Sequence, residues 1–167
     1  GRVADVQKMA EIKAEERNVN PEPTDAQKEA GNYAKGHIKV RSLDITIENA
    51  KGSTRKGKDA KGNAWKVRMN NTYGYFKRTQ GKDGDQIDVF LGENPESGKI
   101  FVVDQIRKTG DSKLFDEHKV MMGFKSSKEA KKAYLSNYSK GWDGLGAITE
   151  MSEEQFKEWL GDGTRTK

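Results

Sequence analysis

The sequence has no cysteine and only two histidines among its 167 residues. Disulfides, thiolate metal sites and cysteine nucleophiles are therefore excluded, and a reducing compartment is permitted. Nothing resembles a Ser-His-Asp triad. No apolar run approaches the ~20 residues that cross a bilayer, and no signal peptide is visible. These absences predict a cytoplasmic protein with no membrane contact.

Hydrophobic residues are also scarce, at 32% against 34% charged residues. This length and composition fit one domain with a single core and a heavily charged surface. The net charge of +5, from 31 basic and 26 acidic residues, suits an anionic partner such as nucleic acid or a phosphate compound. Because no block of six like charges occurs, a mixed and solvated surface explains the net charge equally simply.

Residues 1–23 are predicted to be an N-terminal helical arm or linker. Within them, residues 2–17 read as a polar helix with a thin apolar stripe at Val6, Met9 and Ile12, and the sequence NVNPEP breaks it. Residues 24–161 are predicted to form the main domain, followed by a flexible tail over residues 162–167.

The main domain begins with a short helix whose capping box joins Thr24 and Gln27. Strand patterns follow over residues 36–50, in a glycine-rich basic hairpin over 51–69, and in TYGYF, QIDVFLG, KIFVVDQI and EHKVMMGF. A serine-capped helix, SSKEAKKAYLSNY, comes next. The last helix has a capping box between Ser152 and Gln155 and stops at Gly161. Short strands followed by late helices predict an α+β protein with a small barrel.

The stretch GKDGDQIDVFLG, residues 81–92, places Asp83, Asp85 and Asp88 within six residues. Their spacing does not fit an EF-hand loop. A solvated turn before a strand explains the DGD sequence by itself. Asp88, however, lies inside the apolar run IDVFLG, where a carboxylate is unusual. That position favours a bound divalent cation, above all Mg²⁺.

Other acidic residues stand near cations and phenols. Glu48 ends the strand ITIEN, and Asp111, Asp116 and Glu117 precede Lys119. Carboxylates for metals, with cations and phenols for oxyanions, are typical of phosphoryl transfer to water. His118 is explained as well by a strand-face position as by a ligand role. The candidate cations and phenols are Arg55, Lys66, Arg68, Lys119, Lys140, Tyr73 and Tyr138.

The sequences YGYF at 73–76 and DGDQIDVFLG from Asp83 resemble the signature of soluble, single-domain (family I) inorganic pyrophosphatases. The stretches GNYAKGHIKVRSLDITIENAKGSTR and FDEHKVMMGF resemble more closely the pyrophosphatase-like domain of polyvalent proteins of phages and conjugative elements. The resemblance covers the 24–161 domain. It implies a closed five-stranded OB-like barrel with flanking C-terminal helices, and residence in the host cytoplasm for a phage-encoded protein.

The resemblance also implies an activity, the Mg²⁺-dependent hydrolysis of pyrophosphate by a metal-activated water. Two or more Mg²⁺ ions would bind, with Mn²⁺ as a substitute, and Asp85 would hold the attacking water. The implied catalytic residues are Asp85, Asp88, Lys119, Tyr73 and Arg55. The implied metal ligands are Glu48, Asp83, Asp85, Asp88, Asp111 and Asp116. The implied substrate-binding residues are Arg55, Lys66, Arg68, Lys119, Tyr138 and Lys140, and the choice between Lys66 and Arg68 stays open.

The sequence departs from the family pattern in the part that contacts phosphate. Gln86 replaces a proline, Met69 stands where the family has a tyrosine, and Gly57 stands where it has a glutamate. Two alternatives therefore remain: a hydrolase acting on a phosphoanhydride within a larger nucleotide-type molecule, and a non-catalytic basic barrel that binds nucleic acid or a phage partner. Five converging aspartates argue against the second alternative. The expected assembly is a homo-oligomer or part of a larger multidomain polypeptide.

Overall fold

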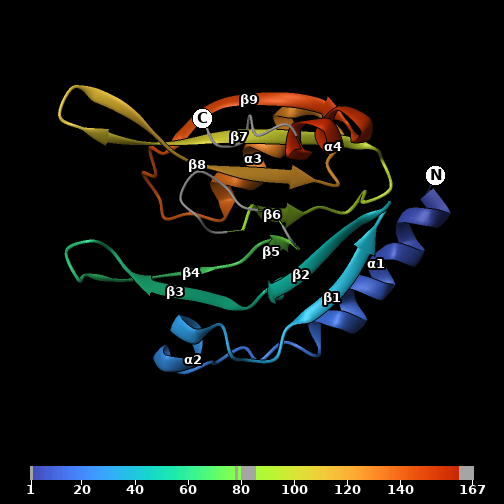
Figure 1. The fold of residues 1–167 in the computed structure, drawn as a ribbon, viewed down its shortest axis with the longest axis horizontal. Coiled ribbons are helices and arrows are strands. Elements are labelled where there is room, and N and C mark those ends of the chain that lie inside the picture. Colours follow the sequence, from blue (N-terminus) through green and yellow to red (C-terminus); the bar gives the residue numbers. More distant parts are fainter. Residues whose placement is uncertain (1, 78, 80–85, 162–167) are drawn as a thin grey trace.

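The computed structural model describes residues 2–77, 79 and 86–161. They form a mixed α+β fold with one large sheet, one separate hairpin and helices on both sides (Figure 1). The elements are α1 (Arg2–Glu16), α2 (Asp25–Ala30), β1 (Gly36–Val40), β2 (Leu43–Asn49), β3 (Thr54–Lys58), β4 (Ala64–Arg68), β5 (Thr72–Phe76), β6 (Asp88–Leu91), β7 (Lys99–Thr109), β8 (Ser112–Met122), α3 (Ser127–Ser136), β9 (Leu145–Ser152) and α4 (Glu153–Gly161).

The large sheet has seven strands in the order β1-β2-β5-β6-β8-β7-β9, and β3 pairs only with β4. The predicted α+β class is confirmed. The closed five-stranded barrel is wrong, because the described sheet has seven strands and its order runs from β1 to β9 without closing. The strand β9, LGAITEMS, was missed because its small and polar residues give a weak strand signal. It pairs along the outer side of β7.

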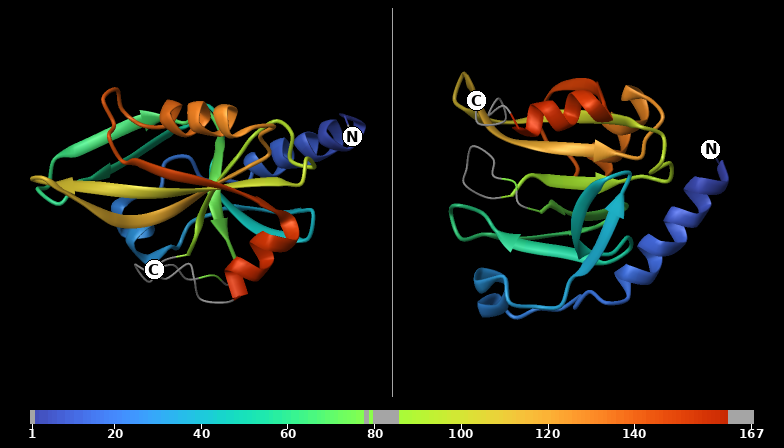
Figure 2. Two further views of the ribbon diagram at one scale, coloured as in Figure 1. Left: turned by 90° about the horizontal axis from the view of Figure 1, so that it is seen from above. Right: turned by 45° about the vertical axis from the view of Figure 1, so that its right-hand side comes forward.

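Helices cover both faces of the sheet and divide the core into two clusters. On one face, Ile12 of α1 and Phe156 of α4 pack with residues of β2, β6 and β7. On the other face, Ala130 and Tyr134 of α3 pack against Phe90, Phe101 and their neighbours. Figure 2 shows α3 and α4 on opposite sides of the β7–β9 region and α1 along the flank of the molecule. The second cluster, here called the α3 core, borders the candidate site.

The helix predicted over residues 2–17 is confirmed as α1, which packs against β1 and β2. Ile12 is 1% exposed and Met9 is partly buried against the same core, whereas Val6 remains 62% exposed. Of the predicted apolar stripe, Met9 and Ile12 therefore pack against the core, and Val6 does not. In the described part of the chain, none of the helices is both long and apolar enough to span a membrane.

The predicted helix caps are confirmed. The hydroxyl of Thr24 accepts from the backbone N–H of Gln27, whose side chain accepts from the Thr24 N–H in return. Ser152 and Gln155 make the same reciprocal pair at α4. The predicted basic hairpin is also confirmed as β3 and β4.

Candidate active site

A buried lysine forms the centre of the site. Lys119 of β8 has a side chain that is 4% exposed, and its Nζ donates to Asp88 Oδ2 at 2.6 Å and to the Tyr73 hydroxyl at 2.8 Å. The register of the sheet brings Asp88 and Lys119 together, because β6 runs parallel to β8 with Asp88 opposite Lys119. Asp88 and Phe90 share the face of β6 that points toward the α3 core, as the alternation in the sequence predicts.

The charges of this pair stabilise each other. Burial alone would lower the pKa of Lys119, but the carboxylate of Asp88 raises it well above its usual range. Burial alone would likewise raise the pKa of Asp88, but Lys119 holds it below the ordinary value. Both groups are therefore ionised at neutral pH. A fixed positive charge in a partly desolvated cavity is suited to bind an oxyanion.

Glu117 is a second carboxylate on Lys119, with Oε1 at 3.1 Å from Nζ. The two residues are two positions apart in β8, so they point to the same face of the strand. Burial raises the pKa of Glu117 to about 7, although the charge of Lys119 acts in the opposite direction. The sequence places Glu117 among the acidic residues before Lys119, but the implied metal ligands in this segment were Asp111 and Asp116.

Glu48 enters the site from a β-bulge in β2. Ile47 pairs with Gly74 while Asn49 pairs with Tyr73, so Glu48 is the extra residue of the bulge. A Cβ at Gly74 would collide with the backbone oxygen of Thr46, and only glycine permits this close approach of β2 and β5. The central glycine of YGYF therefore allows the bulge that carries Glu48.

Glu48 is held by a phenol and lies under the influence of Asp88. The Tyr33 hydroxyl donates to Glu48 Oε2 at 3.2 Å. Burial, followed by the negative charge of Asp88, raises the pKa of Glu48. Nearby cations, first Lys35 and then Arg55, oppose this rise. The site thus contains carboxylates that are costly to ionise without further positive charge.

Arg55 of β3 is positioned by aromatic rings. Its guanidinium carbon lies 4.6 Å from the ring centroid of Tyr73 and 5.2 Å from that of Trp65. Stacked in this way, a guanidinium keeps its edge available for a planar or tetrahedral oxyanion. Tyr138 lies nearby, and its buried hydroxyl has no hydrogen-bond partner of acceptable geometry among the described residues.

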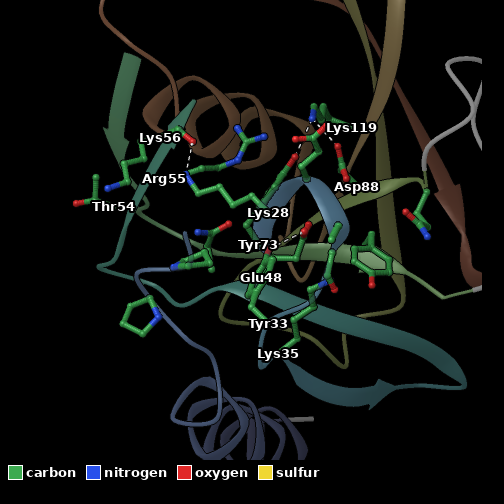
Figure 3. A pocket seen from close by; sticks show the side chains of 18 of the residues that line it. Lys28, Tyr33, Lys35, Glu48, Thr54, Arg55, Lys56, Tyr73, Asp88 and Lys119 are labelled. Atoms are coloured by element: carbon green, nitrogen blue, oxygen red, sulfur yellow. Dashed lines mark hydrogen bonds and ion pairs between the residues drawn. The ribbon is translucent and has the colours of Figure 1, made fainter. Parts of the chain in front are cut away.

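A polar cavity of about 650 Å³ is lined by Glu48, Arg55, Tyr73, Asp88, Glu117 and Lys119, among others. Figure 3 shows Asp88, Lys119, Glu48 and Arg55 converging on it from β6, β8, β2 and β3. Its cationic lining residues, several of which the sequence did not single out, are Lys28, Lys35, Arg55, Lys56 and Lys119. Its acidic lining residues are Glu29, Glu48, Asp88 and Glu117. A polar cavity with both signs of charge suits a metal–anion complex rather than an apolar ligand.

Residues 25–161 match the family model described as Inorganic Pyrophosphatase. The chain belongs to the inorganic pyrophosphatase family. No curated protein and no solved structure matches it. The resemblance inferred from YGYF and DGDQIDVFLG is thus confirmed at the level of the family. The closer likeness to phage polyvalent proteins stays a prediction.

The remaining predicted metal ligands of this pyrophosphatase-family chain lie in different places. Asp83 and Asp85 are outside the described residues. Asp116 is the extra residue of a bulge in β8 and accepts from Gln105 Nε2 at 3.1 Å, close to Glu117. Asp111 is exposed at the turn between β7 and β8, eight residues along the chain from Lys119. Neither Asp116 nor Asp111 is among the residues that line the cavity.

Three predicted phosphate contacts lie outside the cavity. Lys66 and Arg68 alternate with Trp65 and Val67 in β4 and point to the exposed face of the hairpin, while Arg55 points to the other face. Lys140 is exposed in the turn after α3. The cations that line the cavity beside Lys119 are Arg55, Lys28 and Lys35, while Lys56 contributes a backbone carbonyl that accepts from Lys28 Nζ at 3.4 Å.

The donor chemistry of the cavity fits Mg²⁺. Asp88, Glu117 and Glu48 present carboxylate oxygens, which are the ligands that Mg²⁺ takes in proteins. The raised pKa values of Glu117 and Glu48 indicate that a nearby cation would relieve the cost of ionising them. Within residues 2–77, 79 and 86–161, no group of three or more such side chains is close enough to hold a metal alone.

Proposed function

We propose that this chain hydrolyses inorganic pyrophosphate to two phosphates in a Mg²⁺-dependent reaction. The observation that carries the proposal is the buried Lys119, which is held between Asp88 and Glu117 at the end of a polar cavity and beside the stacked Arg55. Membership of the pyrophosphatase family supports the same substrate.

The cations of the cavity would bind the substrate. Lys119 and Arg55 approach from β8 and β3 and can contact different oxygens of one pyrophosphate. Lys28 and Lys35 line the same cavity and add positive charge around it. Because Lys119 and Arg55 are fixed by an ion pair and by ring faces, little reorganisation is needed when negative charge moves to the leaving phosphate.

The carboxylates would hold the metal. Asp88, Glu117 and Glu48 are the described candidates, with Asp83 and Asp85 proposed from the sequence to complete the set. When bound, Mg²⁺ supplies a lowered pKa for a water ligand and charge neutralisation for the phosphates. Lys119 keeps Asp88 ionised and ready to bind metal. The Tyr73 hydroxyl accepts from the ammonium of Lys119 and helps to orient it.

The role of each side chain can be tested by phosphate release from pyrophosphate. Lys119→Met is expected to lower kcat/KM by about 10²- to 10³-fold, the range for loss of one preorganised electrostatic contact. Asp85→Asn is expected to lose turnover at least as severely. The matched control is Asp104→Asn, a carboxylate of β7 that pairs with His118 on the opposite face of the sheet. Full activity in Lys119→Met, with Mg²⁺ present, would contradict the proposal.

A second candidate function is suggested by the exposed face of the β3–β4 hairpin. Lys56 and Lys66 lie directly opposite each other there, with Lys58 and Arg68 on the same face. Opposed like charges destabilise a sheet. Glu22 offsets the charge of Lys56 at 3.4 Å, and an anion bound beside Lys66 would offset the rest. If this face binds DNA, affinity should fall steeply with salt and fall further in Lys66→Glu. Binding that ignores both changes would exclude nucleic acid as the partner.

A further inference from the structure

A second cavity, of about 450 Å³, adjoins the first and shares Arg55, Glu117 and Lys119 with it. Its other walls differ in character. Trp65 of β4 lines one side, and Tyr138 and Trp142 from the segment after α3 line the other. Two of the three tryptophans of the sequence therefore stand around one small space beside the phosphate-binding cations. We call this space the aromatic cavity.

Each indole lies against a glycine. A Cβ at Gly57, which pairs with Trp65 across the hairpin, would come within 2.7 Å of the Trp65 ring. A Cβ at Gly144 would collide with the ring of Trp142. Neither glycine has a left-handed backbone that would require glycine for itself. The absence of a side chain at these two positions therefore serves the placement of the indoles.

The rings are held in place before any ligand binds. Trp142 stacks on Tyr138 with ring centroids 4.6 Å apart and planes 13° apart, and its Nε1 donates to the Tyr134 hydroxyl at 2.9 Å. Trp65 carries the guanidinium of Arg55 on one side. Trp142 is still 37% exposed, so part of its surface is available for a further contact. The buried Tyr138 hydroxyl, which has no partner among the described residues, can donate to a ligand in this space.

We propose that the aromatic cavity binds the base of a nucleoside diphosphate, so that nucleoside diphosphates are substrates as well as pyrophosphate. This inference rests on the proposed hydrolysis at Lys119 and Arg55. The ring stacks on an indole, while the phosphates reach the shared cations. Stacking accepts any base, because every base has a π-face.

The reaction is the same bond cleavage as in pyrophosphate. The oxygen of water bonds to the terminal phosphorus, and the bond from that phosphorus to the bridging oxygen breaks. The bridging oxygen stays on the inner phosphate, which leaves as the nucleoside monophosphate, and one proton is released to solvent. No oxidant, reductant or further co-reactant is needed.

ADP is a suitable probe, and the ratio of kcat/KM for ADP to that for pyrophosphate is the readout. Trp142→Ala is expected to lower this ratio about 5- to 150-fold, the loss that one base-stacking contact gives. Gly144→Ala keeps the indole but displaces it, and should lower the ratio in the same direction. Trp159→Ala is the matched control, because Trp159 packs beside Phe156 in the other core cluster and leaves the ratio at the wild-type value.

A binding measurement checks the same point without turnover. In a Trp159→Phe background the remaining indoles are the two of the aromatic cavity, so ADP should quench the fluorescence and pyrophosphate should not. If the chain hydrolyses pyrophosphate but neither binds nor hydrolyses ADP, the inference is overturned and the pyrophosphatase proposal stands. If ADP is cleaved and pyrophosphate is not, the proposed substrate fails and the aromatic cavity is supported. An unchanged ratio in folded Trp142→Ala and Gly144→Ala would also overturn the inference.

Discussion

Replacing Lys119 with methionine tests how the centre of the site is held together. The ammonium is almost completely buried and lies 2.6 Å from Asp88. Methionine has a similar length and fills the same space without the charge. Asp88 would then keep its negative charge in a desolvated position with no ion-pair partner on β8.

The expected loss is large because removal of one partner leaves a buried charge unpaired. Breaking such a pair typically costs about 3–5 kcal/mol. For a chain of this size each kcal/mol lowers the melting temperature by about 2–4 °C, so the loss is about 6–20 °C. Asp88→Asn in the same chain removes the unpaired carboxylate, so the double variant should lose less than the sum of the single variants. The coupling energy should lie within about 0.5–3 kcal/mol.

The assay is urea denaturation of the wild type, both single variants and the double variant, in EDTA so that no metal replaces the lysine. Lys157→Met is the control, because Lys157 makes an exposed ion pair with Glu153 at 3.1 Å. Surface pairs of this kind contribute about 0–1 kcal/mol. Additive losses for Lys119 and Asp88, with no coupling, would mean that the two side chains do not stabilise each other.

Three further predictions concern other positions. Glu117 has a pKa of about 7 in the fold against an ordinary value of 4.5, so the folded chain binds its proton more tightly than the unfolded chain. The free energy of unfolding in EDTA should therefore rise by at most about 3 kcal/mol as pH falls from 8 to 5. Urea denaturation should show that Glu117→Gln removes this rise, and the same pH profile in the variant and the wild type would contradict the prediction. Ile12→Ala should lower the free energy of unfolding by about 2–5 kcal/mol, measured by the same method, because the side chain is 1% exposed in the core. A loss below about 1 kcal/mol would mean that the packing of α1 is not needed for stability. Gly74→Ala should lower the melting temperature and kcat/KM together, because its Cβ would strike Thr46 and displace Glu48; a fully stable and active variant is the opposing result.

Local signals in the sequence predicted much of the structure. The capping pairs at Thr24 and Ser152 depend on residues three apart, and they form as expected. The alternation around Asp88 predicted that its carboxylate lies on the face of β6 opposite Val89 and Leu91, and Lys119 binds it there. In each case the residues that decide the outcome are neighbours in the sequence.

Features that depend on distant pairing were not predictable in this way. The seven-strand order was not predicted because β9 pairs with β7 across at least 40 residues, and the sequence of β9 gives little strand preference. The bulges at Glu48 and Asp116 change which side chains face the cavity, yet both arise from register against a partner strand. The aromatic cavity likewise joins Trp65 and Trp142 from elements far apart in the chain.

The most direct test of the account is phosphate release from pyrophosphate by the unaltered chain, measured with Mg²⁺ and again with EDTA. We expect turnover with Mg²⁺, none above background with EDTA, and in ¹⁸O-labelled water a label on one of the two phosphates released. A folded protein that releases no phosphate from pyrophosphate with Mg²⁺, or that releases it equally well in EDTA, would contradict the central claim.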